Sequence, residues 1–258
     1  MHYVATARRP RDQRMARVRV DKYLAAFLGP TLLAQVSGDH LRAYRLWLER
    51  PEAGISPQTV VHLLSDARCF FNWAVAEGHL DRSRFPRRLL PRLQERPPDR
   101  LTDDEVDRLL QIAEPFRFTL ALGLATGLLW GELVQARAEH AVRVHGRLYL
   151  TVGLGGGTKS RRIRRVPISP RLIEGRAGNL IPFRDASVFS RSVRRRTGVL
   201  RFRPHMMRHT FACRFLEAGG SLPALQQILG HKSIETTQRY ARLSDASLHA
   251  EMRNLGLA

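Results

Sequence analysis

A proline-rich stretch between residues 82 and 100 constrains the fold of this chain more than any other feature. It contains Pro86, Pro91, Pro97 and Pro98 among several arginines and few strong apolar pairs. Proline fixes φ and lacks a backbone N–H donor, so the stretch resists regular structure and is typical of a linker. A chain of 258 residues is long enough to place a domain on each side of it. We therefore predict two domains joined by a linker over residues 91–100.

The half before the linker has a helical pattern. Apolar residues recur near helical spacing from about residue 20 to residue 89, and this spacing predicts three or four short helices. Breaks are expected at Gly29-Pro30, at residues 37–39 and 54–57, and at residues 77–79. The pattern predicts a helical domain over residues 17–90, preceded by a basic arm over residues 1–16.

The half after the linker mixes helices with a few strands. Thr102 and Glu105 form a capping-box pattern, which predicts a helix from about residue 103. Apolar residues then alternate with period two between Val142 and Ile168, with turns expected at His145-Gly146 and at residues 155–157. The predicted fold class is mainly α with a small antiparallel β-sheet, in a second domain over residues 101–258. Further helices are expected near residues 186–197, 207–218, 222–230, 233–242 and 245–255.

The net charge of the chain indicates a polyanionic partner. The chain has 43 basic and 23 acidic side chains, which gives a formal net charge of +20. The stretch Thr158–Arg214 alone holds 16 basic and 2 acidic residues. Such a concentration is typical of a surface that faces phosphates, and both predicted domains are net positive. The candidate DNA contacts are Arg161, Arg162, Arg164, Arg165, Arg194, Arg195, Arg196, Arg201 and Arg203.

Cysteine usage and hydropathy favour a cytoplasmic protein. Cys69 and Cys213 lie in apolar surroundings without disulfide or metal-ligand spacing, so we expect buried thiols in a reducing compartment and no metal. The longest uncharged apolar run, Phe118–Gly131, is shorter than a membrane span and suits a core helix. No secretory signal is readable at the N-terminus.

Two segments of the second half carry residues suited to phosphate chemistry. His205 and Arg208 are three residues apart at a predicted helix start, so a proton-transfer group and a bidentate cation share one face. Further on, Leu229-Gly230 ends a helix, His231 follows in the turn, and Tyr240 lies on the next helix. A tyrosine hydroxyl can attack phosphorus and hold it covalently.

These segments resemble the tyrosine recombinase family, which includes the phage integrases and the chromosome-dimer resolvases. The resemblance rests on Thr126-Gly127-Leu128 before Glu132, on Thr158-Lys159 in a hairpin, on His205-x-x-Arg208, and on Leu-Gly-His231 followed nine positions later by Tyr240. These motifs occur in the family's order, and the match covers essentially the whole chain.

The resemblance implies a site-specific recombinase that needs no cofactor. Its two domains would close as a C-shaped clamp on double-stranded DNA, and a tetramer would act on inverted-repeat sites. Tyr240 would form a 3′-phosphotyrosine link, Arg208 would neutralise the scissile phosphate, and Lys159 would protonate the leaving 5′ oxygen. His205 and His231 would position protons and the phosphate, with Glu132 in support. The last segment, residues 244–255, resembles a tail that packs on a neighbouring protomer.

One position departs from the family pattern. The arginine that normally follows Thr-Gly-Leu is replaced by Leu129, and the loss of such a guanidinium costs on the order of 10²- to 10³-fold in rate. Three explanations stay open: another arginine such as Arg117, Arg201 or Arg203 replaces it, a partner tunes a slow activity, or the protein is a catalytically impaired DNA-binding relative. Arg137 is too far along its helix to substitute.

Each candidate also has a structural interpretation. Tyr240 can be an ordinary half-buried tyrosine, Lys159 a solvated charge at a hairpin tip, and His205 with Arg208 a capping cluster. His231 can satisfy local backbone groups, and Glu132 can pair with one of the excess arginines. A nicking and sealing enzyme without strand exchange would use the same tyrosine chemistry.

Overall fold

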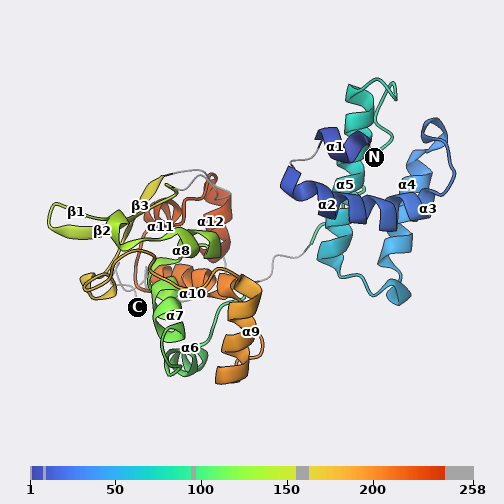
Figure 1. Cartoon of the computed structure of the whole chain (residues 1–258). Helices are drawn as coiled ribbons and strands as arrows, with labels where there is room; N and C mark the ends of the chain where they lie inside the picture. Colours follow the sequence, from blue (N-terminus) through green and yellow to red (C-terminus); the bar gives the residue numbers. More distant parts are fainter. Residues whose placement is uncertain (1, 8–9, 94–96, 155–162, 242–258) are drawn as a thin grey trace, which may run out of the picture. The chain divides into compact units, whose positions relative to one another are not determined.

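The computed structural model describes residues 2–7, 10–93, 97–154 and 163–241 (Figure 1). The chain divides into two compact units, residues 1–95 and residues 96–258. Each unit has its own buried core. No helix in the described ranges combines the length and the apolar character that a membrane crossing requires.

The first unit is helical among its described residues. Ser37 and Ser56 accept hydrogen bonds from backbone N–H groups and begin its two main helices, α4 and α5. Leu41, Tyr44 and Phe71 are fully buried between these helices. The elements are α1 His2–Ala7, α2 Pro10–Arg19, η1 Val20–Ala25, α3 Ala26–Leu28, η2 Leu33–Gln35, α4 Gly38–Glu49, η3 Pro51–Ala53 and α5 Pro57–Ala76.

The N-terminal residues differ from the expectation of a basic arm. The structure has helices α1 and α2 where the arm over residues 1–16 is predicted. Tyr3 and Ala16 are buried, and the Tyr3 ring lies 5.2 Å from Phe70 and 5.3 Å from Trp73 on α5. The many arginines in this segment made its short apolar face hard to recognise in the sequence. In the structure, α5 covers that face.

The second unit combines helices with one small sheet. Thr102 and Glu105 form the predicted capping box at the start of α6. The elements are α6 Asp103–Leu110, α7 Phe116–Thr126, α8 Trp130–Gln135, η4 Ala138–His140, β1 Ala141–Val144, β2 Arg147–Val152, β3 Arg164–Pro167, η5 Pro170–Leu172, α9 Ala186–Thr197, α10 Pro204–Glu217, α11 Leu222–Leu229 and α12 Ile234–Ala241.

The sheet is antiparallel with the order β1-β2-β3, as the alternating pattern predicts. Val144 pairs with Arg147 across a turn in which His145 and Gly146 both have positive φ. On the other side of β2, Tyr149 pairs with Pro167 of β3. The turn expected at residues 155–157 lies outside the described residues.

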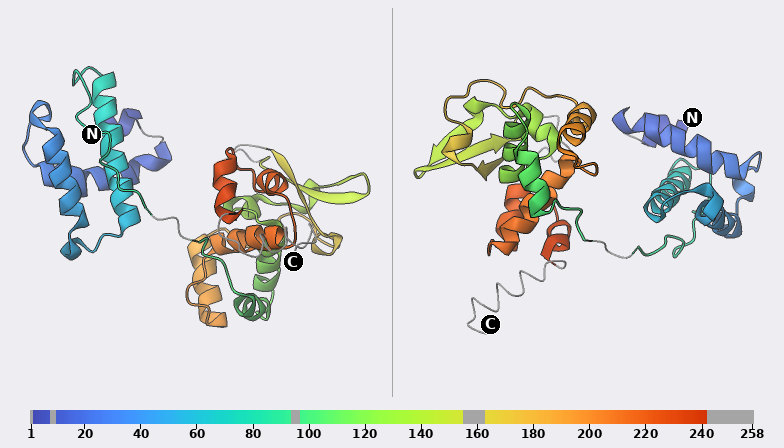
Figure 2. Two further views of the ribbon diagram at one scale, coloured as in Figure 1. Left: turned by 180° about the vertical axis from the view of Figure 1, so that it is seen from behind. Right: turned by 90° about the horizontal axis from the view of Figure 1, so that it is seen from below.

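Helix α10 crosses the middle of the second unit. It lies between α7 on one side and α11 with α12 on the other, and the view from behind shows the same order (Figures 1 and 2). Met206 and Met207 on α10 are buried in the core with Leu120 of α7. This central position brings α10 next to the ends of three other helices.

Most predicted helices of the second unit are present. Helix α9 has the predicted bounds, and α10 begins at Pro204 rather than residue 207 because proline is compatible with the first turn of a helix. The helix expected over residues 245–255 lies outside the described residues. Cys213 is buried, but the expectation of a buried Cys69 is wrong, since Cys69 lies on an exposed position of α5.

Candidate active site

Arg208 is the centre of the candidate site. It lies on α10, is only 3% exposed, and donates from Nη1 to the carbonyl of Gly127 at 2.9 Å and from Nη2 to the carbonyl of Leu229 at 2.7 Å. These carbonyls lie at the C-terminal ends of α7 and α11, where helix dipoles favour a cation. Burial lowers the pKa of Arg208 to about 10, so the side chain remains charged at neutral pH.

The Thr126-Gly127 pair gives Arg208 one of these carbonyls. Gly127 ends α7 with a φ of 62°, and a Cβ atom there would lie 2.4 Å from Cδ1 of Phe211. Thr126 is fully buried and donates from Oγ1 to the carbonyl of Leu122 at 2.6 Å. The glycine is therefore required both by the backbone conformation and by the space available.

Tyr240 lies beside Arg208 and two histidines. It is 5% exposed, and its hydroxyl oxygen lies 2.9 Å from Nδ1 of His209. Its ring is nearly parallel to the His231 ring, with centroids 6.5 Å apart. Burial raises the pKa of the Tyr240 hydroxyl, and the charge of Arg208 partly opposes that rise. The charge of Arg208 therefore acts on this hydroxyl in the direction that favours a phenolate.

His231 occupies the turn after α11. Its Nε2 lies 2.9 Å from Nη2 of Arg208, and its Nδ1 lies 2.8 Å from Oγ1 of Thr237. Burial, followed by the charges of Arg208 and Arg164, lowers the pKa of His231 to about 4. The ring is therefore neutral at physiological pH.

His209 is a member of the site that sequence reasoning missed. It lies one turn after His205 on α10, and the two rings are 4.4 Å apart in an edge-to-face arrangement. Burial and the neighbouring positive charges lower the pKa of His209 to about 4, and that of His205 is also lowered. The i, i+4 spacing from His205 was the available signal, because it places both rings on one face.

Glu132 is held in a buried ion pair. Its carboxylate accepts from Nη1 and Nη2 of Arg164 at 2.6 and 2.9 Å, and from the backbone N–H of Leu129 at 2.9 Å. Burial would raise the pKa of Glu132, but the hydrogen bonds and charge of Arg164 lower it overall. Glu132 is therefore ionised, and it is hydrogen-bonded to the backbone of Leu129.

Arg164 differs from the expectation that it faces DNA. Its side chain is 8% exposed, and besides Glu132 it donates from Nε to the carbonyl of Ile228 at 2.6 Å. A Cβ atom on Gly230 would lie 3.0 to 3.1 Å from the Arg164 side chain, so the guanidinium group is packed against the end of α11. In sequence, Arg164 lies among several other arginines, so its burial could not be predicted from the basic run.

The three arginines considered as replacements for the missing family arginine have other partners. Arg117 pairs with Glu114 at 3.0 Å. Arg201 pairs with Asp99 and Glu105, and Arg203 pairs with Asp99. Arg201 also donates to the carbonyl of residue 100, so it fixes the start of the second unit.

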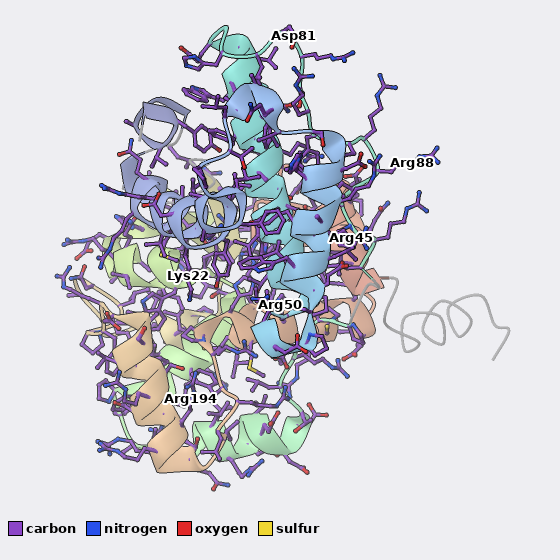
Figure 3. The ribbon with its side chains drawn as sticks, turned by 90° about the vertical axis from the view of Figure 1, so that its right-hand side faces the viewer. Lys22, Arg45, Arg50, Asp81, Arg88 and Arg194 are labelled. Atoms are coloured by element: carbon purple, nitrogen blue, oxygen red, sulfur yellow. The ribbon has the colours of Figure 1, made fainter. Side chains whose placement is uncertain are left out.

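A basic groove of about 510 Å³ adjoins His205. Arg194, which Figure 3 labels on α9, lies in it and donates from Nε to the carbonyl of Phe202 at 2.8 Å. Arg165, Arg195 and Arg196 are exposed. Lys159, Arg161 and Arg162 lie outside the described residues. The groove is lined by Trp130, Ala186, Ser187, Ser190, Arg191, Arg194, Arg203, Pro204 and His205.

No metal centre is formed by the described side chains. Within residues 2–7, 10–93, 97–154 and 163–241, no three His, Cys, Asp or Glu side chains come together in a group that could hold an ion. The cluster around Arg208 combines a tyrosine hydroxyl, neutral histidines and a fixed cation.

Comparisons with known proteins identify the family. The model of the phage integrase family matches residues 172–247. The chain is 31% identical over 219 residues to the tyrosine recombinase XerC of Azotobacter vinelandii, covering 76% of this chain and 73% of that protein. It is 32% identical over 204 residues to the integrase of Escherichia phage P2, covering 76% of this chain and 58% of the integrase. This chain therefore belongs to the phage integrase family, the family of the tyrosine recombinases.

Solved structures share the fold. The XerH site-specific recombinase in a post-cleavage complex with palindromic difH substrate has a TM-score of 0.73 and 15% identity, covering 93% of this chain and 79% of that chain. The Tn1549 transposon integrase in complex with transposon right end DNA has a TM-score of 0.72 and 20% identity, covering 99% and 97%. The mainly helical fold with a small antiparallel sheet is thus that of the tyrosine recombinases.

Proposed function

We propose that this chain is a site-specific DNA recombinase that cleaves and rejoins DNA through a covalent bond between Tyr240 and a 3′ phosphate. The observation that carries the proposal is the cluster in which Tyr240, Arg208 and His231 meet. Nη2 of Arg208 lies 2.9 Å from Nε2 of the neutral His231, whose ring is nearly parallel to that of Tyr240 at 6.5 Å, and the Tyr240 hydroxyl lies 2.9 Å from His209. These are the groups that phosphoryl transfer requires.

In the proposed cleavage step, the Tyr240 oxygen forms a bond to phosphorus while the bond from phosphorus to the 5′ oxygen breaks. Arg208 offsets the negative charge that grows on the phosphoryl oxygens, and His231 and His205 supply hydrogen bonds. The 5′ oxygen takes up a proton, for which Lys159 is the family's donor. Rejoining reverses these bond changes with a 5′ hydroxyl as the attacking group.

His209 is the proposed partner of the nucleophile. A neutral imidazole can accept a hydrogen bond at Nδ1, and the 2.9 Å distance to the Tyr240 oxygen supports this arrangement. Such a bond orients the hydroxyl and receives its proton as the oxygen attacks. From the sequence, the positioning of protons was assigned only to His205 and His231.

DNA binding is assigned to arginines on both units. In the second unit, Arg191, Arg194 and Arg203 line the groove beside His205. In the first unit, a groove of about 490 Å³ is lined by Arg42, Arg45, Leu46, Glu49 and residues 86–89, which include two further arginines. Figure 3 shows Arg45 and Arg88 on the same side of that unit. Phosphate contacts from both units are consistent with a clamp on duplex DNA.

The finer assignments follow from the family. We propose a tetramer on inverted-repeat sites, with residues 244–255 packing on a neighbouring protomer. We also propose that the protein acts on DNA in the cytoplasm, in association with the nucleoid.

Covalent trapping on a nicked DNA substrate tests the proposal. The site is first sought in the DNA flanking the gene, and the full chain is then compared with Tyr240→Phe on a denaturing gel. Tyr149→Phe is the matched control, because Tyr149 lies on β2 rather than on α12. We expect a protein–DNA band from the native chain and from Tyr149→Phe, and none from Tyr240→Phe. A band that persists in Tyr240→Phe, or its absence from the native chain on a bound site, contradicts the proposal.

A further inference from the structure

The buried ion pair between Arg164 and Glu132 has no part in the chemistry described so far. Both side chains are largely removed from solvent, with 8% exposure for Arg164 and none for Glu132. A buried pair of this kind costs desolvation energy, and removal of one partner leaves an uncompensated charge. Its position beside the candidate site therefore needs an explanation.

Two short backbone segments connect the pair to Arg208. On one side, Glu132 accepts from the N–H of Leu129, while Arg208 donates to the carbonyl of Gly127 two residues earlier. On the other side, Arg164 donates to the carbonyl of Ile228, and Arg208 donates to the carbonyl of the next residue, Leu229. Arg208 is therefore hydrogen-bonded to both backbone segments, and Glu132 and Arg164 are each hydrogen-bonded to one of them.

The charges in this cluster have opposing effects. The carboxylate of Glu132 raises the pKa of Arg208, whereas the guanidinium of Arg164 lowers it. Glu132 and Arg164 cancel each other, so the three groups together keep one positive charge. Without Arg164, the same cluster would have no net charge, and Glu132 would attract the Arg208 side chain away from an incoming phosphate.

We propose that Arg164 is a positioning residue for DNA cleavage, which neutralises Glu132 and leaves the charge of Arg208 available to the scissile phosphate. This inference rests on the proposed function. Arg164 does not itself replace the arginine missing at Leu129, because its contacts are with Glu132 and with the carbonyl of Ile228. Arg117 and Arg201 pair with carboxylates elsewhere, and Arg203 pairs with Asp99 beside the groove that His205 lines.

The test is a double-mutant cycle on the full-length chain. The variants are Arg164→Met, Glu132→Gln and the combination of both, with Arg164→Lys as the variant that keeps the charge. The rate of covalent complex formation is measured in a single turnover at saturating DNA, together with DNA affinity and the melting temperature. We expect Arg164→Met to cleave on the order of 10²-fold more slowly than the native chain. The double variant should recover most of that loss, because it restores one net positive charge.

A second measurement separates charge from packing. The scissile phosphate is replaced by an uncharged methylphosphonate, which removes the negative charge that Arg208 has to meet. The defect of Arg164→Met should shrink on this substrate, whereas a defect caused by lost packing should not. This readout also applies if Arg164→Met is less stable, because both substrates are compared with the same protein.

The outcomes are distinct. Recovery in the double variant, with a smaller defect on methylphosphonate, supports the role of Arg164. If the double variant is as slow as Arg164→Met, or if the defect is undiminished on methylphosphonate, the proposal is overturned. Failure of the proposed function looks different, since the native chain itself would then form no Tyr240-dependent band.

Discussion

The hydroxyl oxygen of Tyr240 and Nδ1 of His209 lie 2.9 Å apart, although 31 residues separate the two side chains in sequence. The contact joins α12 to α10, next to Arg208. The pKa of His209 is about 4, so its ring is uncharged at neutral pH and can accept a hydrogen bond. This pairing holds the hydroxyl of the proposed nucleophile, Tyr240, in one orientation.

We predict that His209→Phe slows covalent complex formation by roughly 100-fold, the low end of what a positioned proton acceptor contributes. Phenylalanine fills the space but cannot accept a proton from Tyr240. His209→Gln keeps a hydrogen-bond acceptor and should retain more activity. Single-turnover cleavage with equal DNA affinity checks this. Equal rates for native chain and His209→Phe would assign the contact to packing only.

Gly127→Ala should damage both stability and cleavage. The left-handed φ of 62° and a Cβ atom 2.4 Å from Phe211 predict a loss of about 1–3 kcal/mol in the free energy of unfolding. The shifted carbonyl also weakens the support of Arg208. Gly131→Ala is the control, because a Cβ atom there meets nothing within 4 Å in helix α8. Denaturant unfolding of both variants gives the comparison; similar losses would contradict the steric argument.

Stability should fall as the pH is lowered from about 6.5 to about 5. The pKa values of His209 and His231 are lowered to about 4 in the folded chain, from an ordinary value of 6.5. Between these values the unfolded chain binds protons that the folded chain does not, so acid favours unfolding and the effect vanishes above the ordinary value. Melting temperatures across this range test the prediction. The slope should become shallower in His209→Gln, and an unchanged slope would exclude His209 as a source.

DNA affinity should depend steeply on salt. Each phosphate contact that is removed should decrease the magnitude of the negative slope of log K against log salt by about 0.9. We predict such a decrease for Arg191→Gln and for Arg203→Gln in the groove beside His205. Arg147→Gln, at the start of β2 on the far side of the second unit from α9, should leave the slope unchanged (Figure 1). DNA-binding titrations at several salt concentrations test this prediction. Equal slopes for all variants would show that the groove beside His205 does not contact DNA phosphates.

Local patterns were sufficient for much of the fold. The capping box of Thr102 and Glu105, the turn at His145-Gly146 and the bounds of α9 all depend on interactions between residues close in sequence. Such interactions can be predicted without knowing the rest of the fold. Helices α1 and α2 were not predicted, because the few apolar side chains on them become buried only by packing against Phe70 and Trp73 of α5.

The candidate site was predicted in its motifs but not in its internal contacts. Motif order indicated Tyr240, Arg208 and His231, which the structure brings together. The partnership of Arg164 with Glu132 spans 32 residues and depends on how β3 meets α8. In sequence, Arg164 is one of several similar arginines, and only burial distinguishes it from its neighbours.

The last turn of α11 provides adjacent carbonyls to two different cations, Ile228 to Arg164 and Leu229 to Arg208. A small displacement of this helix end would therefore loosen both guanidinium groups together. The candidate site is then assembled or disrupted as one unit rather than residue by residue. Substitutions in α11 at positions that do not contact DNA should consequently slow cleavage as substitutions of the candidate catalytic residues do.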